Sequence, residues 1–480
     1  MKFIRTPQAE LPEFDPMTVI RDWKNGEAFR LNDALTGVCV FGATGSGKTS
    51  GVAKHLAIGY LGAGFGGLVL CAKKEEREQW LEWAKIAQRE DDLVIISADG
   101  NNCFNFMNWE ASRAGEGGGL TINIVALLDE VAGAIAGGAG GADGGNQNKF
   151  FDDALHHMNI NLVDLCLFAG VDVALSAMRD ILNSAPKTLE EAKSNEWLNG
   201  GGYCALSLEA AEHNVKNSGE RADFEECKKY WLQEYPNLSD KTRSIITLSF
   251  AMLVRPFITR PLRRLFSSVT NVKPEDTFNG KIIIVDLPVQ EFRLAGRVAN
   301  LAWKYCFQVA VLRRMKPAGE NLRPVFLWAD EAQNFVTGFD AEYQAVARSA
   351  GGCTVYLTQN RESYRRVLGN DDAVDSLLGN LQAKFFCQNS GNTNKWAAEL
   401  FGERWIKSVS TSFNQGAAEN SGSSGVSHSE QRRYFVEPAT FNTLKRGGAA
   451  FNYQVESIVY KGGHLFCDGE PFKLLTFNQG

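Results

Sequence analysis

The stretch GATGSGKT, residues 42–49, decides the fold class of this 480-residue chain. It matches the pattern GxxxxGK[ST], it follows the apolar run GVCVF at residues 37–41, and a helical pattern, TSGVAKHLAIGYLG, continues from residue 49. Glycines permit positive φ angles, so successive backbone N–H groups can converge on an anion at the start of a helix. A glycine turn without a ligand is the alternative, but the flanking strand and helix favour a phosphate-binding loop.

The residue types in this loop predict how a nucleotide would be held. Lys48 would reach the β- and γ-phosphates of ATP, and the Thr49 hydroxyl would take one position around Mg²⁺. We therefore predict ATP and Mg²⁺ as the ligands. The predicted binding set is Gly42, Ala43, Thr44, Gly45, Ser46, Gly47, Lys48, Thr49 and Ser50.

A second acidic site is expected where the apolar strand PVFLWADE, residues 324–331, ends. Asp330 would hold Mg²⁺ through water, and Glu331 would orient and deprotonate the attacking water. Kinases and GTPases commonly lack the second acid, so the pair favours hydrolysis over phosphate transfer. Two alternatives stay open: a strand that simply ends in solvated acids, and Asp286 in IIIVDLP as the acid at the site.

Two further polar residues are candidates because of their places near these strands. Gln359 ends the strand CTVYLTQ and would report the γ-phosphate if that strand neighbours the one ending at Glu331. Taken alone, a strand-terminal glutamine is equally consistent with simple capping. Arg348, on the intervening helix, could be offered to a neighbouring subunit, where it would stabilise transition-state charge. A solvated surface arginine is the alternative, and the rivals for the role are Arg361, Arg365 and Arg366.

The pattern of buried strands and amphipathic helices predicts an α/β fold with a mostly parallel central sheet. Strand patterns occur up to about residue 100 and again from about residue 280, and helical patterns fill the interval. We expect residues 1–100 to form an N-terminal segment and the first part of a nucleotide-binding domain. Residues 101–275 are then an inserted all-α domain, and residues 276–480 are the second part of the nucleotide-binding domain.

Two segments have compositions typical of flexible chain. Residues 137–148, GGAGGADGGNQN, are rich in glycine and are expected to form a mobile loop. Residues 409–431 are rich in serine, glycine and asparagine and are expected to be flexible as well, ahead of a short final set of strands around residues 449–463.

Charge and cysteine usage limit the class of protein. The formal net charge of -6 argues against a uniformly basic surface, so any DNA contact must be local. The ten cysteines stand singly, which indicates neither zinc nor a disulfide framework and suits a reduced, cytoplasmic setting. No stretch is apolar enough for a signal peptide or a membrane span, so we expect no intrinsic span, and recruitment to the inner membrane would need a partner.

The order of these parts resembles the type IV secretion coupling proteins of the TraD/TraG type, which are relatives of the FtsK and HerA DNA-pumping ATPases. Three stretches carry the resemblance more narrowly than the loop does: NCFNFMNW (102–109), FFDDALHHMNINLVDLCL (150–167) and GNLQAKFFCQNSGNTNKWAAELFGE (379–403). The resemblance covers roughly residues 36 to 460. It implies a RecA-like P-loop NTPase that works as a homo-hexamer with DNA threaded centrally.

Carried over by position, the resemblance implies Lys48 and Thr49 on phosphate and Mg²⁺, and Asp330 and Glu331 as the acidic pair. It also implies Arg348 as an arginine acting on the neighbouring subunit and Gln359 as a sensor.

The chain departs from the family at several points. Members commonly begin with transmembrane helices, which this chain does not show. The usual Asp-x-Lys-Gly after the second strand is replaced by CAKKEE, residues 71–76, and Phe106 or a neighbour stands where the family has a proline. The basic stretch RPFITRPLRRLF is a candidate for DNA contacts in a pore, or else a solvated helix face or subunit interface: Arg255, Arg260, Arg263 and Arg264.

The sequence therefore favours an ATP-hydrolysing DNA translocase or coupling protein that handles single- or double-stranded DNA in conjugative type IV secretion or a related mobile-element process. A relaxase or a secretion channel is the candidate partner. The alternatives are an adaptor ATPase that recruits protein substrates, a HerA-like DNA-processing or packaging motor, and a non-motor signalling NTPase.

Overall fold

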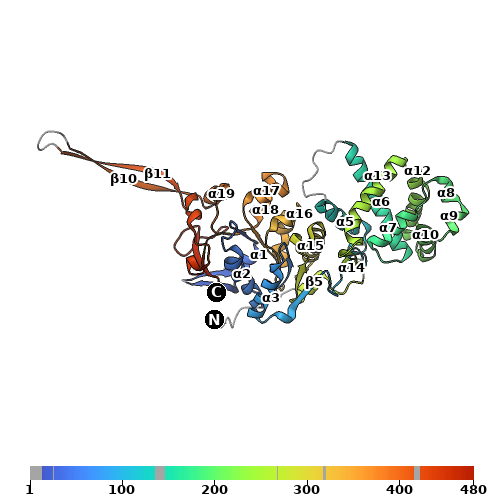
Figure 1. The fold of residues 1–480 in the computed structure, drawn as a ribbon, viewed down its shortest axis with the longest axis horizontal. Helices are drawn as coiled ribbons and strands as arrows, with labels where there is room; N and C mark the ends of the chain where they lie inside the picture. The colour runs from blue at the N-terminus through green and yellow to red at the C-terminus, as the bar shows by residue number, and fades with distance from the viewer. Residues whose placement is uncertain (1–12, 25, 136–145, 267–268, 317–319, 416–421) are drawn as a thin grey trace.

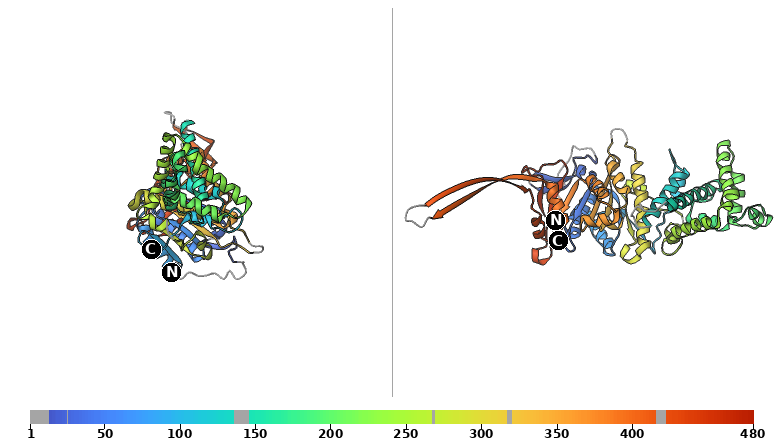
Figure 2. Two further views of the ribbon diagram at one scale, coloured as in Figure 1. Left: turned by 90° about the vertical axis from the view of Figure 1, so that its right-hand side faces the viewer. Right: turned by 90° about the horizontal axis from the view of Figure 1, so that it is seen from above.

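The molecule is elongated, with three parts in a row along its long axis (Figure 1). The computed structural model describes residues 13–24, 26–135, 146–266, 269–316, 320–415 and 422–480. A long β-hairpin projects from one end, an α/β body lies in the middle, and a group of helices forms the other end. Figure 2 shows the three parts from above in its right view, and along the long axis of the molecule in its left view.

A nine-stranded sheet forms the centre of the body, in the order β13-β12-β9-β3-β8-β7-β4-β6-β5. The strands from β9 to β5 are each parallel to their neighbours, whereas β12 and β13 are antiparallel. The strands are β3 (Val38–Phe41), β4 (Gly66–Leu70), β5 (Leu93–Ser97), β6 (Ile282–Asp286), β7 (Val325–Ala329), β8 (Gly352–Thr358), β9 (Ala383–Phe386), β12 (Gln454–Lys461) and β13 (Lys473–Asn478). This confirms the predicted α/β class with a mostly parallel sheet.

Helices cover both faces of the sheet, as a parallel sheet requires. Successive residues of a strand point to opposite faces, so Val38 and Val40 pack into one core while Cys39 and Phe41 pack into the other. The first face is covered by α1 (Leu31–Leu35), α2 (Lys54–Gly62) and α3 (Glu75–Ala87). The second is covered by α15 (Val289–Leu312), α16 (Phe339–Ala347), α17 (Arg361–Leu368), α18 (Asp371–Asn380) and α19 (Asn392–Phe401).

The described segment between β5 and β6 is helical. Several of its helices begin where a short polar side chain accepts a backbone N–H, as Asn105, Asn217 and Ser239 do. Its core continues into the core on the second face of the sheet. The helices are α4 (Phe106–Ala111), α5 (Thr121–Ile135), α6 (Asn146–Ala169), α7 (Leu175–Ser184), α8 (Leu189–Lys193), α9 (Asn195–Asn199), α10 (Tyr203–Asn214), α11 (Ser218–Lys229), α12 (Tyr235–Asn237), α13 (Asp240–Ile258) and α14 (Leu262–Phe266).

A buried ion pair joins α15 to α16. Lys304 Nζ donates to Asp340 Oδ2 at 2.6 Å, and both side chains are 1% exposed. Asp340 also accepts from Tyr356 Oη on β8 at 2.6 Å and from Gln308 Nε2 at 2.8 Å, while Lys304 donates to the carbonyl of Phe335 at 2.7 Å. The network therefore fixes the chain that follows β7, where the candidate acidic pair lies.

The expectation of flexible chain at residues 409–431 is wrong for the described part. Two 13-residue strands, β10 (Glu403–Gln415) and β11 (Gly422–Tyr434), pair antiparallel through 13 consecutive residue pairs without a register shift. Composition misled here because serine at every second position alternates with Val409, Thr411 and Phe413, and that period of two is the mark of a strand. A smaller unpredicted hairpin, β1 (Val19–Lys24) and β2 (Glu27–Arg30), precedes α1.

The glycine-rich stretch at residues 137–148 lies mostly outside the described residues. Its last three residues belong to the described part and open α6, so they form helix rather than loop. Across the described ranges, every helix is too short or too polar to cross a membrane.

Candidate nucleotide-binding site

A cavity of about 870 Å³ opens at the carboxyl end of the central strands. The loop at residues 44–50 forms one wall, and the segments after β4, β6, β7 and β8 contribute the others. Side chains after neighbouring parallel strands meet at one edge of a sheet, which is where ligands of open α/β sheets bind. The lining is Thr44, Gly45, Ser46, Gly47, Lys48, Thr49, Ser50, Lys54, Ala72, Lys73, Gln79, Glu82, Trp83, Val289, Gln290, Arg293, Glu331, Gln333, Asn334, Gln359 and Gln479.

The loop has the backbone that phosphate binding needs. Gly45 and Gly47 have φ angles of 73° and 80°, the left-handed region that side chains disfavour. A methyl group on Gly47 would also approach the Val455 side chain on β12 to 2.4 Å. Gly47 precedes a six-residue helical segment, Lys48–Ala53, of the π type, which leads into α2. The first two residues of the predicted binding set, Gly42 and Ala43, are not part of the cavity lining, and their backbone N–H groups donate to the carbonyls of Thr358 and Gln388.

Thr49 and Asp330 meet in the position expected of a metal-binding pair. The Thr49 hydroxyl donates to Asp330 Oδ2 at 2.6 Å, and Asp330 Oδ1 accepts the backbone N–H of Glu331 at 2.8 Å. Hydroxyl and carboxylate oxygens are the ligands that Mg²⁺ prefers. The loop, the lysine and this oxygen pair therefore fit a nucleotide with its Mg²⁺.

Glu331 is the point on which the cationic and amide side chains converge. Its Oε1 accepts from Lys73 Nζ at 2.7 Å and lies 3.5 Å from Lys48 Nζ. Its Oε2 accepts from Gln333 Nε2 at 2.8 Å and from Gln359 Nε2 at 3.4 Å. The backbone of Glu331 is also left-handed, with φ 51° and ψ 47°, a strained conformation of the kind found at functional sites.

These contacts set the charge of the site. Burial alone would raise the pKa of Glu331, but Lys48, together with hydrogen bonds from Lys73 and Gln333, outweighs burial and lowers it to about 2. Burial alone would lower the pKa of Lys73, but Asp330 and Glu331 outweigh it and raise that pKa. Glu331 and Lys73 are therefore both charged at neutral pH. Glu331 is ionised, as a proton acceptor must be, but a pKa so far below neutrality makes it a weak base while both lysines pair with it.

Gln359 lies where the strand order places it beside the acidic pair. Its strand β8 is parallel to β3 on one side and to β7 on the other. A sensor role for Gln359 required its strand to lie next to the strand that ends at Glu331. The pairing of β8 with β7 meets this requirement.

Arg348 and Asp286 lie away from the cavity lining. Arg348 precedes β8, at the opposite end of that strand from Gln359; it is exposed and donates to Asn32 Oδ1 at 2.9 Å. Asp286, the alternative acid, pairs with Arg77 Nη1 at 3.1 Å. The rival Arg361 is held by Asp371 at 2.9 Å and Asp375 at 2.7 Å, and Arg365 lies 3.4 Å from Asp371.

Sequence reasoning missed several residues of the cavity. Lys73 was noted only as a departure from a family pattern, because its contact with Glu331 depends on β4 lying next to β7 in the sheet. Gln479, close to the chain's end, donates to the Ser50 hydroxyl at 2.6 Å, a contact 429 residues apart in sequence that no local pattern indicates. Arg293, with φ 49°, also lines the cavity.

The fold and this site define a P-loop NTPase fold of the RecA-like class. Residues 324–446 match the protein-family model described as "TraM recognition site of TraD and TraG". No curated protein sequence matches the chain. The match covers the strand that ends in the acidic pair, Arg348, Gln359 and the hairpin.

Solved structures with the same fold include those of conjugative coupling proteins. The unbound coupling protein TrwBΔN70 aligns over 97% of this chain and 88% of its own, with 14% identity and a TM-score of 0.61. TrwB in complex with ADP and Mg²⁺ gives the same values. VirB4 of Thermoanaerobacter pseudethanolicus aligns over 96% of this chain and 95% of its own, with 13% identity and a TM-score of 0.50. The resemblance to coupling proteins, and the RecA-like fold that it implied, are confirmed.

Proposed function

We infer that this protein is an ATP-hydrolysing motor of the coupling-protein type, which moves or recruits DNA in conjugative type IV secretion or a related mobile-element process. ATP and Mg²⁺ would occupy the cavity, with Lys48 on the phosphates and Thr49 and Asp330 at the metal. Glu331 would take the proton of the attacking water, and Gln359 would respond to the γ-phosphate. The matched family and the TrwB fold support this assignment.

One observation carries the proposal that the motor has several subunits. The cavity holds the phosphate loop, the acidic pair and the glutamine, whereas Arg348 lies at the far end of β8. Seven residues of strand, at about 3.3 Å each, place Arg348 roughly 20 Å from Gln359. Arg348 therefore cannot serve the nucleotide of its own chain and would act on a neighbour's, as in a ring of six copies.

The remaining roles follow from exposure and charge. The exposed arginines of α13, of α14 and of the turn between them would contact DNA phosphates: Arg255, Arg260, Arg263 and Arg264. Residues 101–275 would act as a separate domain for recognising cargo. The free thiols of all ten cysteines suit a reduced compartment such as the cytoplasm. Any attachment to the inner membrane would come from a partner.

A second candidate is recruitment of a protein substrate or of a relaxase-bound complex. It is favoured by the family match at residues 324–446, which describes a recognition site for another protein. In that case DNA would be incidental to hydrolysis.

The test is ATP turnover by the full chain with single- and double-stranded DNA, at several salt concentrations, with the Arg348→Ala variant beside wild type. DNA should accelerate wild-type turnover, and added salt should weaken that acceleration because phosphate contacts are salt-dependent. Arg348→Ala should lower the DNA-stimulated rate by about 10³-fold or more, since it removes a charge that acts on the transition state.

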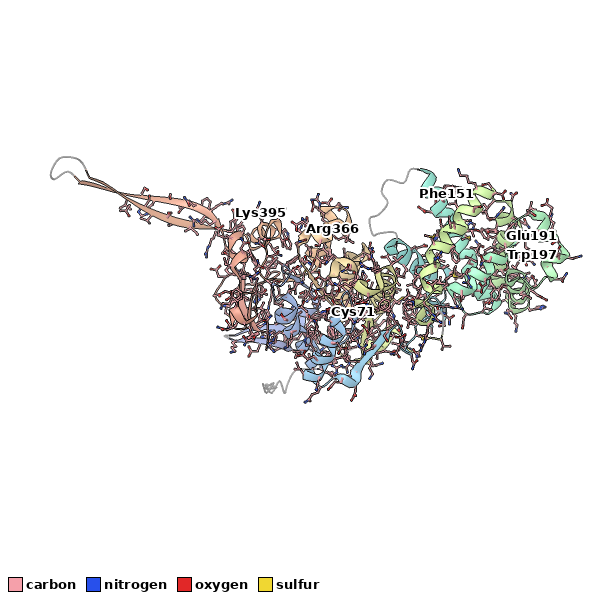
Figure 3. All side chains as sticks on the ribbon, in the orientation of Figure 1. Cys71, Phe151, Glu191, Trp197, Arg366 and Lys395 are labelled. Carbon is pink, nitrogen blue, oxygen red and sulfur yellow. The ribbon has the colours of Figure 1, made fainter. Side chains whose placement is uncertain are left out.

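The matched comparison is Arg366→Ala, which removes the exposed rival arginine from α17 (Figure 3). If Arg348 is the acting arginine, this variant should keep a rate close to that of wild type, and a loss in Arg366→Ala alone would assign the role to Arg366. Turnover that is indifferent to DNA at low salt would favour the protein-recruitment candidate. An unchanged rate in Arg348→Ala would remove that arginine from the mechanism.

Lys73 offers a test of the role of Glu331 through pH. The dependence of kcat/KM on pH reports groups of the free enzyme. A pKa near 2 for Glu331 keeps this carboxylate ionised down to low pH, so it should impose no acid limb on the wild-type profile near neutrality. Lys73→Met removes one of the two cations, so the pKa of Glu331 should rise by about one unit or more, and an NMR titration of the carboxyl group measures this change directly.

Lys74→Met is the control for this experiment. Lys74 is exposed and does not line the cavity, so its loss should leave the profile unchanged. An unchanged pKa of Glu331 in Lys73→Met would contradict the charge coupling assigned to these two residues.

A further inference from the structure

The β10–β11 hairpin extends away from the body with few ties to it (Figures 1 and 2). Its attachments lie at its base, where Arg404 contacts Glu470 at 3.2 Å and the N–H of Phe435 donates to Gly402. Lys395 on α19 lies close to where the hairpin departs (Figure 3). A two-stranded hairpin that stands alone in water is marginally stable at best. This hairpin therefore gains little stability from its own chain.

The two faces of the hairpin differ in chemistry. One carries Trp405, Val409 and Val426, whose side chains are 63%, 57% and 58% exposed. The opposite face carries serines, and Ser410 shares a hydrogen bond of 2.6 Å with Ser427 across the strands. The face with Trp405 also carries Lys407, Glu430 and Arg432, and Ile406 lies on the opposite face. The hairpin therefore presents exposed apolar side chains interleaved with charges, with no cover from the described residues of its own chain.

The outer parts of both long edges of the hairpin, residues 408–415 and 422–429, lack the usual protection against pairing. Edge strands are normally blunted by charges, proline or bulges. Residues 408–415 and 422–429 contain no Lys, Arg, Asp, Glu or Pro, and the register between the strands is continuous. Each edge therefore offers free backbone donors and acceptors to another strand.

The pairing of β10 with β11 inside one hairpin shows that the same two strands from different copies can also pair along these edges. When two hairpins point the same way side by side, β10 of one runs antiparallel to β11 of the other, just as within one hairpin. At equal height the same residue pairs recur: Lys407 faces Glu430, which lie 3.9 Å apart within the hairpin, and Trp405 faces Arg432, stacked at 5.2 Å. Charges and apolar groups are thus complementary between copies.

Nucleic acid suits the outer half of the hairpin poorly. Binding to phosphates depends on lysine and arginine. The outer residues named above carry neither, and the cations of the hairpin lie toward its base. A second copy of this chain is therefore the occupant that the observations favour.

We propose that the free edge of β10 in one copy pairs with the free edge of β11 in another, so that the hairpins of adjacent copies form one continuous antiparallel sheet. Copies that stand side by side with their long axes parallel would bring their hairpins together at the same end of the assembly. The pairing does not depend on nucleotide or on the proposed DNA motor function, because no residue of the cavity takes part.

The experiment uses two full-length chains that carry one introduced cysteine each. In a Cys467→Ser background, which removes the exposed native thiol, one chain carries Ser410→Cys and the other Ser427→Cys, with different tags. Coexpressed and oxidised, they should form a disulfide between unlike chains, because these residues would face each other across the new pairing. Ser410→Cys alone should form little, since two copies of residue 410 would be about 10 Å apart.

A second variant tests the assembly without using disulfide cross-linking. Residues 408–429 are replaced by a two-residue Asn-Gly turn between Lys407 and Glu430, which already face each other. The molar mass in solution should fall, or the concentration needed for assembly should rise at least tenfold, while the circular dichroism and melting of the body stay those of wild type.

Absence of the disulfide between unlike chains, or equal cross-linking by Ser410→Cys alone, would overturn the β10-to-β11 pairing. An unchanged mass with a loss of salt-dependent DNA binding would show instead that the hairpin serves nucleic acid. Because neither readout uses ATP turnover, failure here is distinguishable from failure of the proposed motor.

Discussion

Replacing Glu331 with glutamine is expected to lower ATP turnover by about 10²- to 10⁴-fold while ATP binding is retained. Glutamine has nearly the same shape as glutamate, but its amide cannot accept the proton of the attacking water. The change also removes the negative charge that Lys48 and Lys73 share, so both lysines become available to phosphate. Single-turnover hydrolysis and binding of a labelled ATP measure the two effects separately.

The control for this experiment is Glu82→Gln. Glu82 lines the same cavity, but its side chain is 64% exposed, and among the described residues its ion pair is a 4.0 Å contact with Lys54. Turnover by this variant should stay close to that of wild type. If Glu331→Gln also kept its turnover, Asp286 would have to be reconsidered as the acid. If both binding and turnover were lost, Glu331 would be a structural support of the loop rather than the base.

The second large effect is expected on stability. Asp340→Asn should lower the free energy of unfolding by about 3 to 5 kcal/mol, because it leaves the buried Lys304 without its charged partner. Asp340 also accepts from Tyr356 and Gln308, and an amide cannot replace both acceptor oxygens. Urea unfolding followed by tryptophan fluorescence measures the change.

Asp371→Asn provides the comparison. It removes a partner of Arg361 in an ion pair whose acid is 43% exposed, and such exposed pairs contribute about 0 to 1 kcal/mol. The two variants change the same functional group and differ mainly in burial. Equal losses of stability would contradict the role assigned to the buried network, and that network also holds the carbonyl of Phe335 just after the acidic pair.

Local patterns predicted the parts of the site that lie within short segments. The phosphate loop and the acidic strand end could be predicted because each needs particular residue types within about eight positions. The strand order then placed Gln359 next to the acidic pair. Lys73 and Gln479 were not predictable, because their contacts depend on which strands become neighbours and on a chain end folding back onto the loop.

The hairpin shows the opposite failure. Serine, glycine and asparagine were taken as evidence of flexibility, although the alternation of Val409, Thr411 and their neighbours with serine has the period of a strand. Composition indicates how readily water solvates a segment. The spacing of similar residues indicates whether a strand or a helix would place them on one face. Where the two disagreed, periodicity gave the better prediction.

The strand order has a consequence for the order in which the chain can fold during synthesis. The strand that carries the phosphate loop, β3, pairs only with β8 and β9 among the described strands, and both are made more than 300 residues later. Likewise β5 pairs only with β6, from which the whole helical segment separates it. A ribosome adding about 5 to 20 residues per second would expose these early strands unpaired for many seconds. The helices at the far end can pack first, and the nucleotide cavity closes only when the last third of the chain has emerged.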